Sequence, residues 1–307
     1  MSTDISTTDP DALVAFTESR GRLFGIAYRI LGSAADAEDV VQETWVRWQL
    51  CDRDVVREPA AFLATTTTRL AINVLNSARV TRETYIGPWL PAPVDTSADP
   101  ALGAERDEAL HFATLMMMER LTPTERAAYV LREAFDYPYA RIAEIIESTQ
   151  TAARQLVSRA RKHLGQSQRR HASAASHHMF LRAFLDAARS GDTAKLETLL
   201  ATDVVSHTDG GGVVRHTARR PIVGREKVVR FLAGLSQWFW GDVEVEPLDA
   251  NGRSAVFLRH NDDVFAVLTV TVQAGAISQV LWIMNPAKIA PIGIHASLHI
   301  GRPEWAA

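Results

Sequence analysis

Residues 139–164, YARIAEIIESTQTAARQLVSRARKHL, decide the architecture of the middle of the chain. Pro138 precedes a short helix predicted over 139–146, residues 147–150 form a turn, and a second helix is predicted over 151–164. At about 100° per residue, one face of the second helix is apolar. Its members are Ala153, Leu156, Val157, Ala160 and Leu164. The pattern predicts a helix-turn-helix with one buried face.

The opposite face of the second helix carries hydrogen-bonding and basic side chains, which can reach base edges and phosphates in a DNA major groove. Residues 149–171 hold six basic side chains and no acidic one, which adds attraction to phosphate. An ordinary helix pair with a solvated basic face is the alternative that this segment alone leaves open. The candidate DNA-reading residues are Thr151, Arg154, Gln155, Ser158, Arg159 and Lys162.

Composition narrows the protein class. A length of 307 residues suggests two or three domains, and an apolar share of 47% excludes wholesale disorder. The 33 basic and 36 acidic residues give a net charge of −3, which argues against a protein that coats DNA by bulk electrostatics. Cys51 is the only cysteine, so an intrachain disulfide and a Cys-rich zinc site are both excluded.

Targeting signals are not visible in the sequence. The first residues are acidic and polar, unlike the basic and then apolar segment of a signal peptide. The longest apolar stretch, 264–272, is far shorter than the roughly 20 residues that span a bilayer. We therefore expect a cytoplasmic protein that does not enter the membrane.

The chain divides into three parts with different patterns. Apolar residues at three- and four-residue steps predict helices over 10–84, with a break at Gly32 and an N-cap at Ser33. Six prolines and glycines make 86–104 a linker, and helices resume over 105–164. After a second polar linker, two helices precede a series of strands. The predicted fold is two all-α modules followed by an α+β domain. The predicted strands are 204–208, 243–247, 254–259, 264–272 and 276–282.

Two motifs carry a family resemblance. Residues 36–45, DAEDVVQETW, resemble the polymerase-binding helix of region 2 in sigma-70-type factors of the extracytoplasmic-function (ECF) class. Residues 121–126, LTPTER, with VLRE at 130–133 and the helix-turn-helix, resemble region 4 of the same factors. Both regions joined by a linker are the ECF arrangement.

Three further motifs resemble ECF factors that carry a fused SnoaL-like C-terminal domain. They are YIGPWLPAP at 85–93, DGGG at 209–212 and NPAKI at 285–289. Two positions depart from the subgroup pattern: Ala92 stands where the linker usually has Glu, and Val213 stands where Lys usually follows the glycines. If those two side chains pair in the family, the contact here rests on other groups.

The resemblance implies a division of labour among domains. Residues 8–85 would be sigma region 2, 86–104 the linker, 105–166 sigma region 4 and 176–290 the SnoaL-like regulatory domain. Region 2 would bind core RNA polymerase, through its beta-prime and beta subunits, and the −10 element, and region 4 would bind the −35 element. The implied polymerase contacts are Asp36, Asp39, Val40, Gln42, Glu43 and Trp45. The implied −10 contacts are Arg69, Asn73, Asn76, Arg79 and Arg82, since amides and arginines suit a flipped base.

The C-terminal domain is expected to act as a scaffold in place of a separate anti-sigma factor. Residues 176–290 would contact the linker and bias regions 2 and 4 toward or away from a polymerase-compatible spacing. The glycines at 210–212 would let backbones approach closely. The implied interdomain residues are Trp89, Leu90, Pro91, Pro93, Asp209, Gly210, Gly211, Gly212, Asn285, Pro286 and Lys288.

Other functions remain open at this point. A helix-turn-helix regulator with a small-molecule sensor in its C-terminal domain is one alternative, and a SnoaL-type cyclase or isomerase is another. Candidate pocket residues for the latter are His207, Asp209, His260, Asp262, Trp238, Phe239, Trp240 and Trp282. We expect no catalysis, cofactor or metal, because lone His and Asp residues on strands and clustered Trp residues are more often structural.

Overall fold

The computed structural model describes residues 10–96, 110–165, 172–215, 217–261 and 263–293. Two compact units make up the chain. The first contains residues 1–79, 101–109 and 120–163, and the second contains 80–100, 110–119 and 164–307.

The first unit begins with three long helices, α1 (Pro10–Leu31), α2 (Ala34–Leu50) and α3 (Pro59–Glu83), with a 3-10 turn, η1 (Arg53–Val55), before α3. The predicted N-cap is confirmed, because the Ser33 side chain accepts a hydrogen bond from the Asp36 amide. Trp48 is buried and its indole N–H donates to the Ala12 carbonyl at 3.0 Å. That bond ties the end of α2 to the start of α1.

Three shorter helices follow among the described residues of this unit: α6 (Pro123–Glu133), α7 (Tyr139–Ile145) and α8 (Gln150–Gly165). Thr122 and Glu125 form a capping box at the start of α6, so each side chain bonds the other's backbone amide. Ala153, Val157 and Ala160 are buried, which confirms the predicted apolar face of the helix-turn-helix.

The second unit is built on a mixed sheet of order β2-β1-β6-β5-β4-β3, in which only the β1–β6 pair is parallel among the described strands. The strands are β1 (Leu200–Asp209), β2 (Ile222–Val223), β3 (Glu244–Ala250), β4 (Arg253–His260), β5 (Asp263–Gln273) and β6 (Ala276–Ile283). The helices are α5 (Phe112–Met118), α9 (Ala174–Ser190), α10 (Thr193–Leu199), α11 (Arg225–Ser236) and α12 (Pro286–Gly293).

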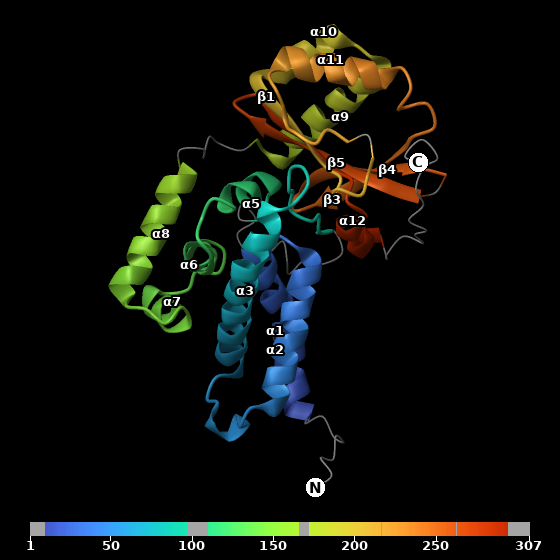
Figure 1. Ribbon diagram of the computed structural model, residues 1–307. Helices are drawn as coiled ribbons and strands as arrows, with labels where there is room; N and C mark the ends of the chain where they lie inside the picture. The colour runs from blue at the N-terminus through green and yellow to red at the C-terminus, as the bar shows by residue number, and fades with distance from the viewer. Residues whose placement is uncertain (1–9, 97–109, 166–171, 216, 262, 294–307) are drawn as a thin grey trace. The chain divides into compact units, whose positions relative to one another are not determined.

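The two faces of the sheet bury different partners. Helices α9, α10 and α11 cover one face (Figure 1), where Phe184, Val228 and Trp282 belong to one apolar core. The other face packs against α5, α12 and the linker, and its core joins Leu90, Phe112 and Ile283. A segment between the two sigma-like motifs in the sequence is therefore built into the second unit.

The fold class expected from the sequence is confirmed: helical segments precede a domain with a mixed sheet. Helices were expected over 105–164 with a turn at 147–150, and the described part of this segment forms four helices, α5, α6, α7 and α8, separated by turns and caps. Helices α11 and α12 and the short strand β2 were not predicted, since each depends on packing against the sheet. None of the helices in the described ranges is long and apolar enough to cross a membrane.

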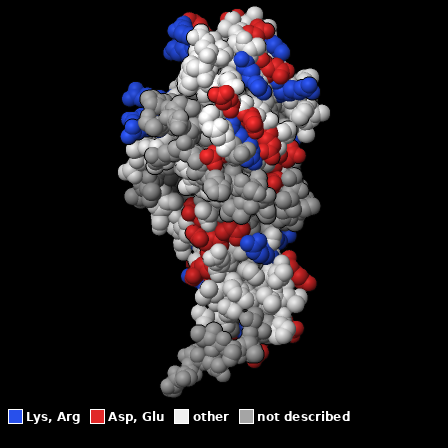
Figure 2. Space-filling view, turned by 90° about the vertical axis from the view of Figure 1, so that its right-hand side faces the viewer, with Lys and Arg blue, Asp and Glu red and all other residues white. Residues whose placement is uncertain are grey.

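Charged side chains on the face drawn in Figure 2 are mixed in sign. Over the upper part of that view, Lys and Arg lie interspersed with Asp and Glu rather than gathered into one basic surface. Among the described residues on that face, the mixed signs leave no broad basic surface that would bind phosphates.

Candidate functional site

Helix α2 presents a polar stripe to solvent. Asp39, Gln42 and Glu43 are exposed, and Glu43 forms an ion pair with Arg47 at 2.8 Å on the same helix. Asp36 is half-buried, and so is Trp45, whose ring lies 4.8 Å from that of Phe16. These five expected polymerase contacts are therefore at least partly accessible to a partner on the surface of α2.

Val40 differs from the expectation, because its side chain is buried in the helical core. The helical period explains this: Ala37, Val40 and Val41 share the inward face of α2. Two apolar side chains that were not among the expected polymerase contacts, Val46 and Leu50, are exposed on this helix, Leu50 with 81% of its surface. They supply the apolar surface that Val40 lacks.

Helix α3 carries the expected −10 residues. Arg69, Asn73 and Asn76 are exposed and fall at four- and three-residue steps, so they share one side of the helix. The side chains of Arg79 and Arg82 lie outside the described residues.

Arg69 is held by the end of α7. Its guanidinium donates to the carbonyls of Glu144 and Ile145, both at 2.9 Å, and lies 3.0 Å from the Glu147 carboxylate. The last carbonyls of a helix have no partner within it, and the negative end of its dipole favours a cation. In the opposite direction, Arg141 donates to the Ala61 carbonyl at 3.0 Å. In this structure, therefore, a residue expected to read the −10 element caps a helix of the helix-turn-helix.

Helix α8 exposes all six of the expected −35 residues. Two of them have structural partners as well: Arg159 pairs with the buried Glu125 at 3.2 Å, and Arg154 lies over the Tyr139 ring at 5.5 Å. Arg161, two residues further along α8, pairs with Glu133 at 2.7 Å, and its hydrogen bond to Glu133 raises the pKa of Arg161. Substituting Arg159 would thus disturb α6 as well as any contact with DNA.

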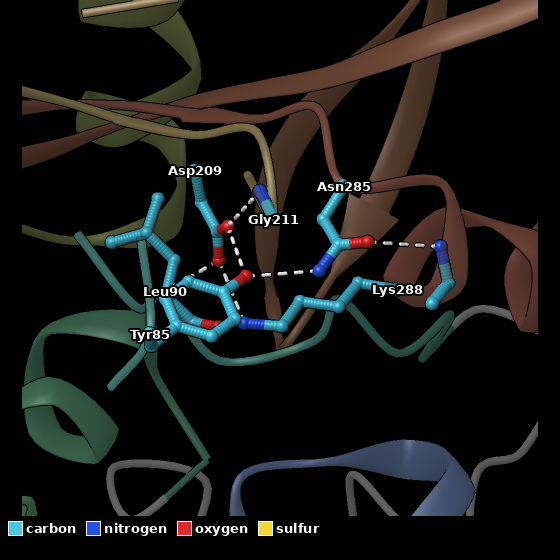
Figure 3. A network of polar contacts seen from close by, with 7 residues as sticks. Tyr85, Leu90, Asp209, Gly211, Asn285 and Lys288 are labelled. Atoms are coloured by element: carbon cyan, nitrogen blue, oxygen red, sulfur yellow. Dashed lines mark hydrogen bonds and ion pairs between the residues drawn. The ribbon is translucent and has the colours of Figure 1, made fainter. Parts of the chain in front are cut away.

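The linker is joined to the sheet by a buried polar network that we call the linker site: Tyr85, Leu90, Asp209, Asn285 and Lys288 (Figure 3). The Asp209 carboxylate, at the end of β1, has no exposed surface. It accepts hydrogen bonds from the Tyr85 hydroxyl at 2.5 Å, the Leu90 amide at 2.9 Å and the Gly211 amide. A buried carboxylate is costly unless it is paired and hydrogen-bonded, and here both conditions are met.

Lys288 supplies the positive charge of the linker site. Its ammonium lies 2.6 Å from the Asp209 carboxylate and donates to the Leu90 carbonyl at 2.5 Å. The same ammonium lies over the Trp89 ring, 4.2 Å from its centroid, a cation–π distance. Burial and the bond to Asp209 raise the pKa of the Tyr85 hydroxyl, so Tyr85 stays a donor at neutral pH.

The glycine triplet shapes the same site. Gly211 has a φ of +63°, and a Cβ there would lie 2.6 Å from the Asn285 side chain. Asn285 in turn donates to the Tyr85 hydroxyl at 2.9 Å. Asp209 and Lys288 thus contact the linker at Leu90, and Tyr85, which was not among the expected interdomain residues, takes part in the same contact.

The remaining predicted interdomain residues lie around this network. Pro91 and Pro93 are buried with the linker, Gly210 follows Asp209, and Pro286 opens α12. The two positions that depart from the family pattern differ in burial: Ala92 is buried, whereas Val213 is exposed. The Asp209–Lys288 pair provides the charged contact here.

The residues considered for catalysis do not form one pocket. By strand alternation, His207 and Asp209 share the sheet face that meets the linker. Trp240 and Trp282 belong to the core on the opposite face, under the helices. Burial lowers the pKa of His207. The Asp209 carboxylate is already hydrogen-bonded to the Leu90 amide and the other partners of the linker site. Asp262 lies outside the described residues.

Comparison with known proteins agrees with these features. Residues 15–81 match the family model "Sigma-70 region 2", and residues 111–164 match "Sigma-70, region 4". The ECF RNA polymerase sigma factor SigJ of Mycobacterium tuberculosis is 40% identical over 227 residues, which cover 72% of each chain. The chain belongs to the ECF sigma factor family. As a member of that family it binds core RNA polymerase and promoter DNA and directs transcription initiation.

Two further relatives of this ECF sigma factor extend over most of its length. The probable ECF RNA polymerase sigma factor SigI of Mycobacterium tuberculosis is 30% identical over 283 residues, 91% of this chain and 94% of the relative. The crystal structure of Mycobacterium tuberculosis SigJ aligns with a TM-score of 0.73 at 33% identity and covers 91% of this chain and 98% of that one. The likeness to SigJ thus includes the C-terminal domain.

Proposed function

We propose that the C-terminal domain of this ECF sigma factor modulates promoter-specific initiation in cis by holding the linker between regions 2 and 4. The observation that carries the proposal is the buried Asp209–Lys288 pair, which closes on the linker backbone at Leu90. Under this proposal a separate anti-sigma factor is not required, because the restraint is part of the chain.

Three surfaces would carry the sigma activity itself. The exposed stripe of α2, with Val46 and Leu50 added to Asp39, Gln42 and Glu43, would dock on the polymerase clamp. The exposed side of α3 would contact the −10 element, and the exposed face of α8 would contact the −35 element in the major groove. Release of Arg69 from α7 would have to precede its use on DNA.

We further propose that the C-terminal domain has no catalytic role. Asp209, the strongest candidate base, already accepts three hydrogen bonds and pairs with Lys288. A base with that many partners is a poor proton acceptor for a substrate. Turnover of a small molecule by the purified chain would overturn this part of the proposal.

Run-off transcription with reconstituted holoenzyme tests the modulation. Asp209→Asn and Trp89→Ala are each compared with a matched exposed variant, Asp203→Asn on the same strand and Trp238→Ala. We expect the first two to change promoter-specific transcript yield by about threefold or more while still co-eluting with core polymerase, and the controls to leave it unchanged. Equal yields from all four would remove the proposed modulation.

A further inference from the structure

The β3–β4 turn contains an asparagine, Asn251, whose side chain is buried. Asn251 and Gly252 connect Ala250 to Arg253 and both have positive φ, +56° and +70°. Asn-Gly at such positions is the common two-residue hairpin turn, and this alone would explain the residue type. Side chains at hairpin tips normally face water, but Asn251 has no exposed surface.

Linker residues bury this side chain. The Asn251 Oδ1 accepts a hydrogen bond from the Val94 amide at 3.0 Å, and its backbone amide donates to the Val94 carbonyl at 2.9 Å. Asp95 forms an antiparallel bridge with Ala250, and the Thr96 amide donates to the Asp249 carbonyl at 3.0 Å. Residues 94–96 therefore pair with the end of β3.

The other half of the same amide reaches a different part of the chain. The Asn251 Nδ2 donates to the Leu110 carbonyl at 3.0 Å. Leu110 is buried and directly precedes α5, which packs on the same sheet face. One carboxamide thus bonds both Val94 and Leu110, which are separated by 15 residues in the sequence. A carboxamide suits this position, because its oxygen accepts one hydrogen bond while its nitrogen donates another.

This geometry changes the reach of the linker. A free linker of about 20 residues would span on the order of 25 Å and vary widely around that value. Because Val94 and Leu110 meet at one side chain, the residues between them add nothing to the reach between regions 2 and 4. The linker then permits a narrower range of distances between the two DNA-binding regions.

We infer that Asn251 is a positioning residue that sets the tolerance of this sigma factor for the spacing between the −10 and −35 elements. It acts through the linker and does not touch DNA. The inference rests on the proposed function, namely that the C-terminal domain holds the linker, and adds which promoter property that restraint controls. Each base pair of spacing moves the two elements by about 3.4 Å, so a narrower range of reach selects a narrower range of promoters.

Two variants separate the side chain from the turn. Asn251→Gly keeps the left-handed backbone and removes both side-chain bonds. Asn251→Asp keeps the acceptor for Val94 but replaces the donor to Leu110. The matched control is Asn261→Gly, an exposed asparagine of the next hairpin with a φ of +48°.

Hydrogen–deuterium exchange of the full-length chain is the first measurement. With Asn251→Gly we expect exchange about tenfold faster in peptides covering 88–96 and 110–116, with the strands β5 and β6 unchanged. With Asn251→Asp we expect the effect mainly in 110–116. Asn261→Gly should match the unsubstituted chain in both peptides, and the same result for Asn251→Gly would overturn the inference.

Run-off transcription is the second measurement, on a promoter recovered by mapping start sites of the reconstituted holoenzyme, with the spacer shortened or lengthened by one to three base pairs. The quantity compared is the ratio of transcript yield on an altered spacer to transcript yield on the native spacer. We expect this ratio to be about fivefold higher for Asn251→Gly than for Asn261→Gly. An unchanged spacer profile together with faster exchange would overturn the positioning role while leaving modulation through Asp209 intact. If Asp209→Asn and Trp89→Ala leave yield on the native spacer unchanged, the proposed function fails separately.

Discussion

Lys288 and Asp209 form an ion pair at 2.6 Å in which the carboxylate is fully buried and the lysine nearly so. We predict that Lys288→Met lowers the free energy of unfolding of the second unit by roughly 3–5 kcal/mol, because it leaves a buried carboxylate without its cation. Urea denaturation followed by circular dichroism measures this. The double variant Asp209→Asn/Lys288→Met should cost less than the sum of the two single changes, and strict additivity would contradict the coupling.

Arg69 gives a prediction that separates its two roles. Arg69→Ala removes both the bonds to α7 and the expected −10 contact, whereas Glu147→Gln weakens only the former. We expect Arg69→Ala to reduce open-complex formation by about tenfold or more and Glu147→Gln to leave it equal or higher. Permanganate footprinting of the promoter measures opening. A comparable loss with Glu147→Gln would show that capping α7, not contacting DNA, is what matters.

Helix α8 is expected to make two kinds of contact with DNA, one to phosphates through Lys162 and one to bases through Gln155. Lys162→Ala is expected to weaken holoenzyme binding equally on all promoter sequences and to reduce the slope of log affinity against log salt by about 1. Gln155→Ala is expected to cost about 1–3 kcal/mol on the preferred −35 sequence and much less on a scrambled one. Binding titrations at several salt concentrations measure both, with Lys227→Ala, an exposed lysine of α11, as the control.

His177 predicts how stability depends on pH. Its Nε2 donates to the Val270 carbonyl at 2.7 Å, and burial lowers its pKa below the usual 6.5. The unfolded chain therefore takes up a proton near pH 6.5 while the folded chain takes it up only at lower pH. We expect the free energy of unfolding to fall as the pH drops below 6.5, and to fall less in His177→Gln, whose amide can still donate to Val270. A His177→Gln chain with an unchanged slope would assign the effect to other groups such as His207.

Local patterns in the sequence predicted local structure well. The cap at Ser33 and the apolar face of α8 depend on neighbours three or four residues away, and both are present. The linker contact was expected only through the family resemblance. Asn251 was not selected because its partners, Val94 and Leu110, are about 150 residues away in sequence. The burial of Val40 was missed because a β-branched residue on an amphipathic helix fits a core and an interface equally well.

The burial of Leu90 and Val94 against the sheet has a practical consequence for dissecting this protein. A truncation that ends between α8 and α9 does not simply subtract a domain, because it also strips the cover from apolar linker residues and leaves them facing water. Loss of activity in such a fragment would then reflect self-association as much as lost regulation. Chimeras between related factors should instead exchange residues 85–118 together with the C-terminal domain, as two segments with three junctions.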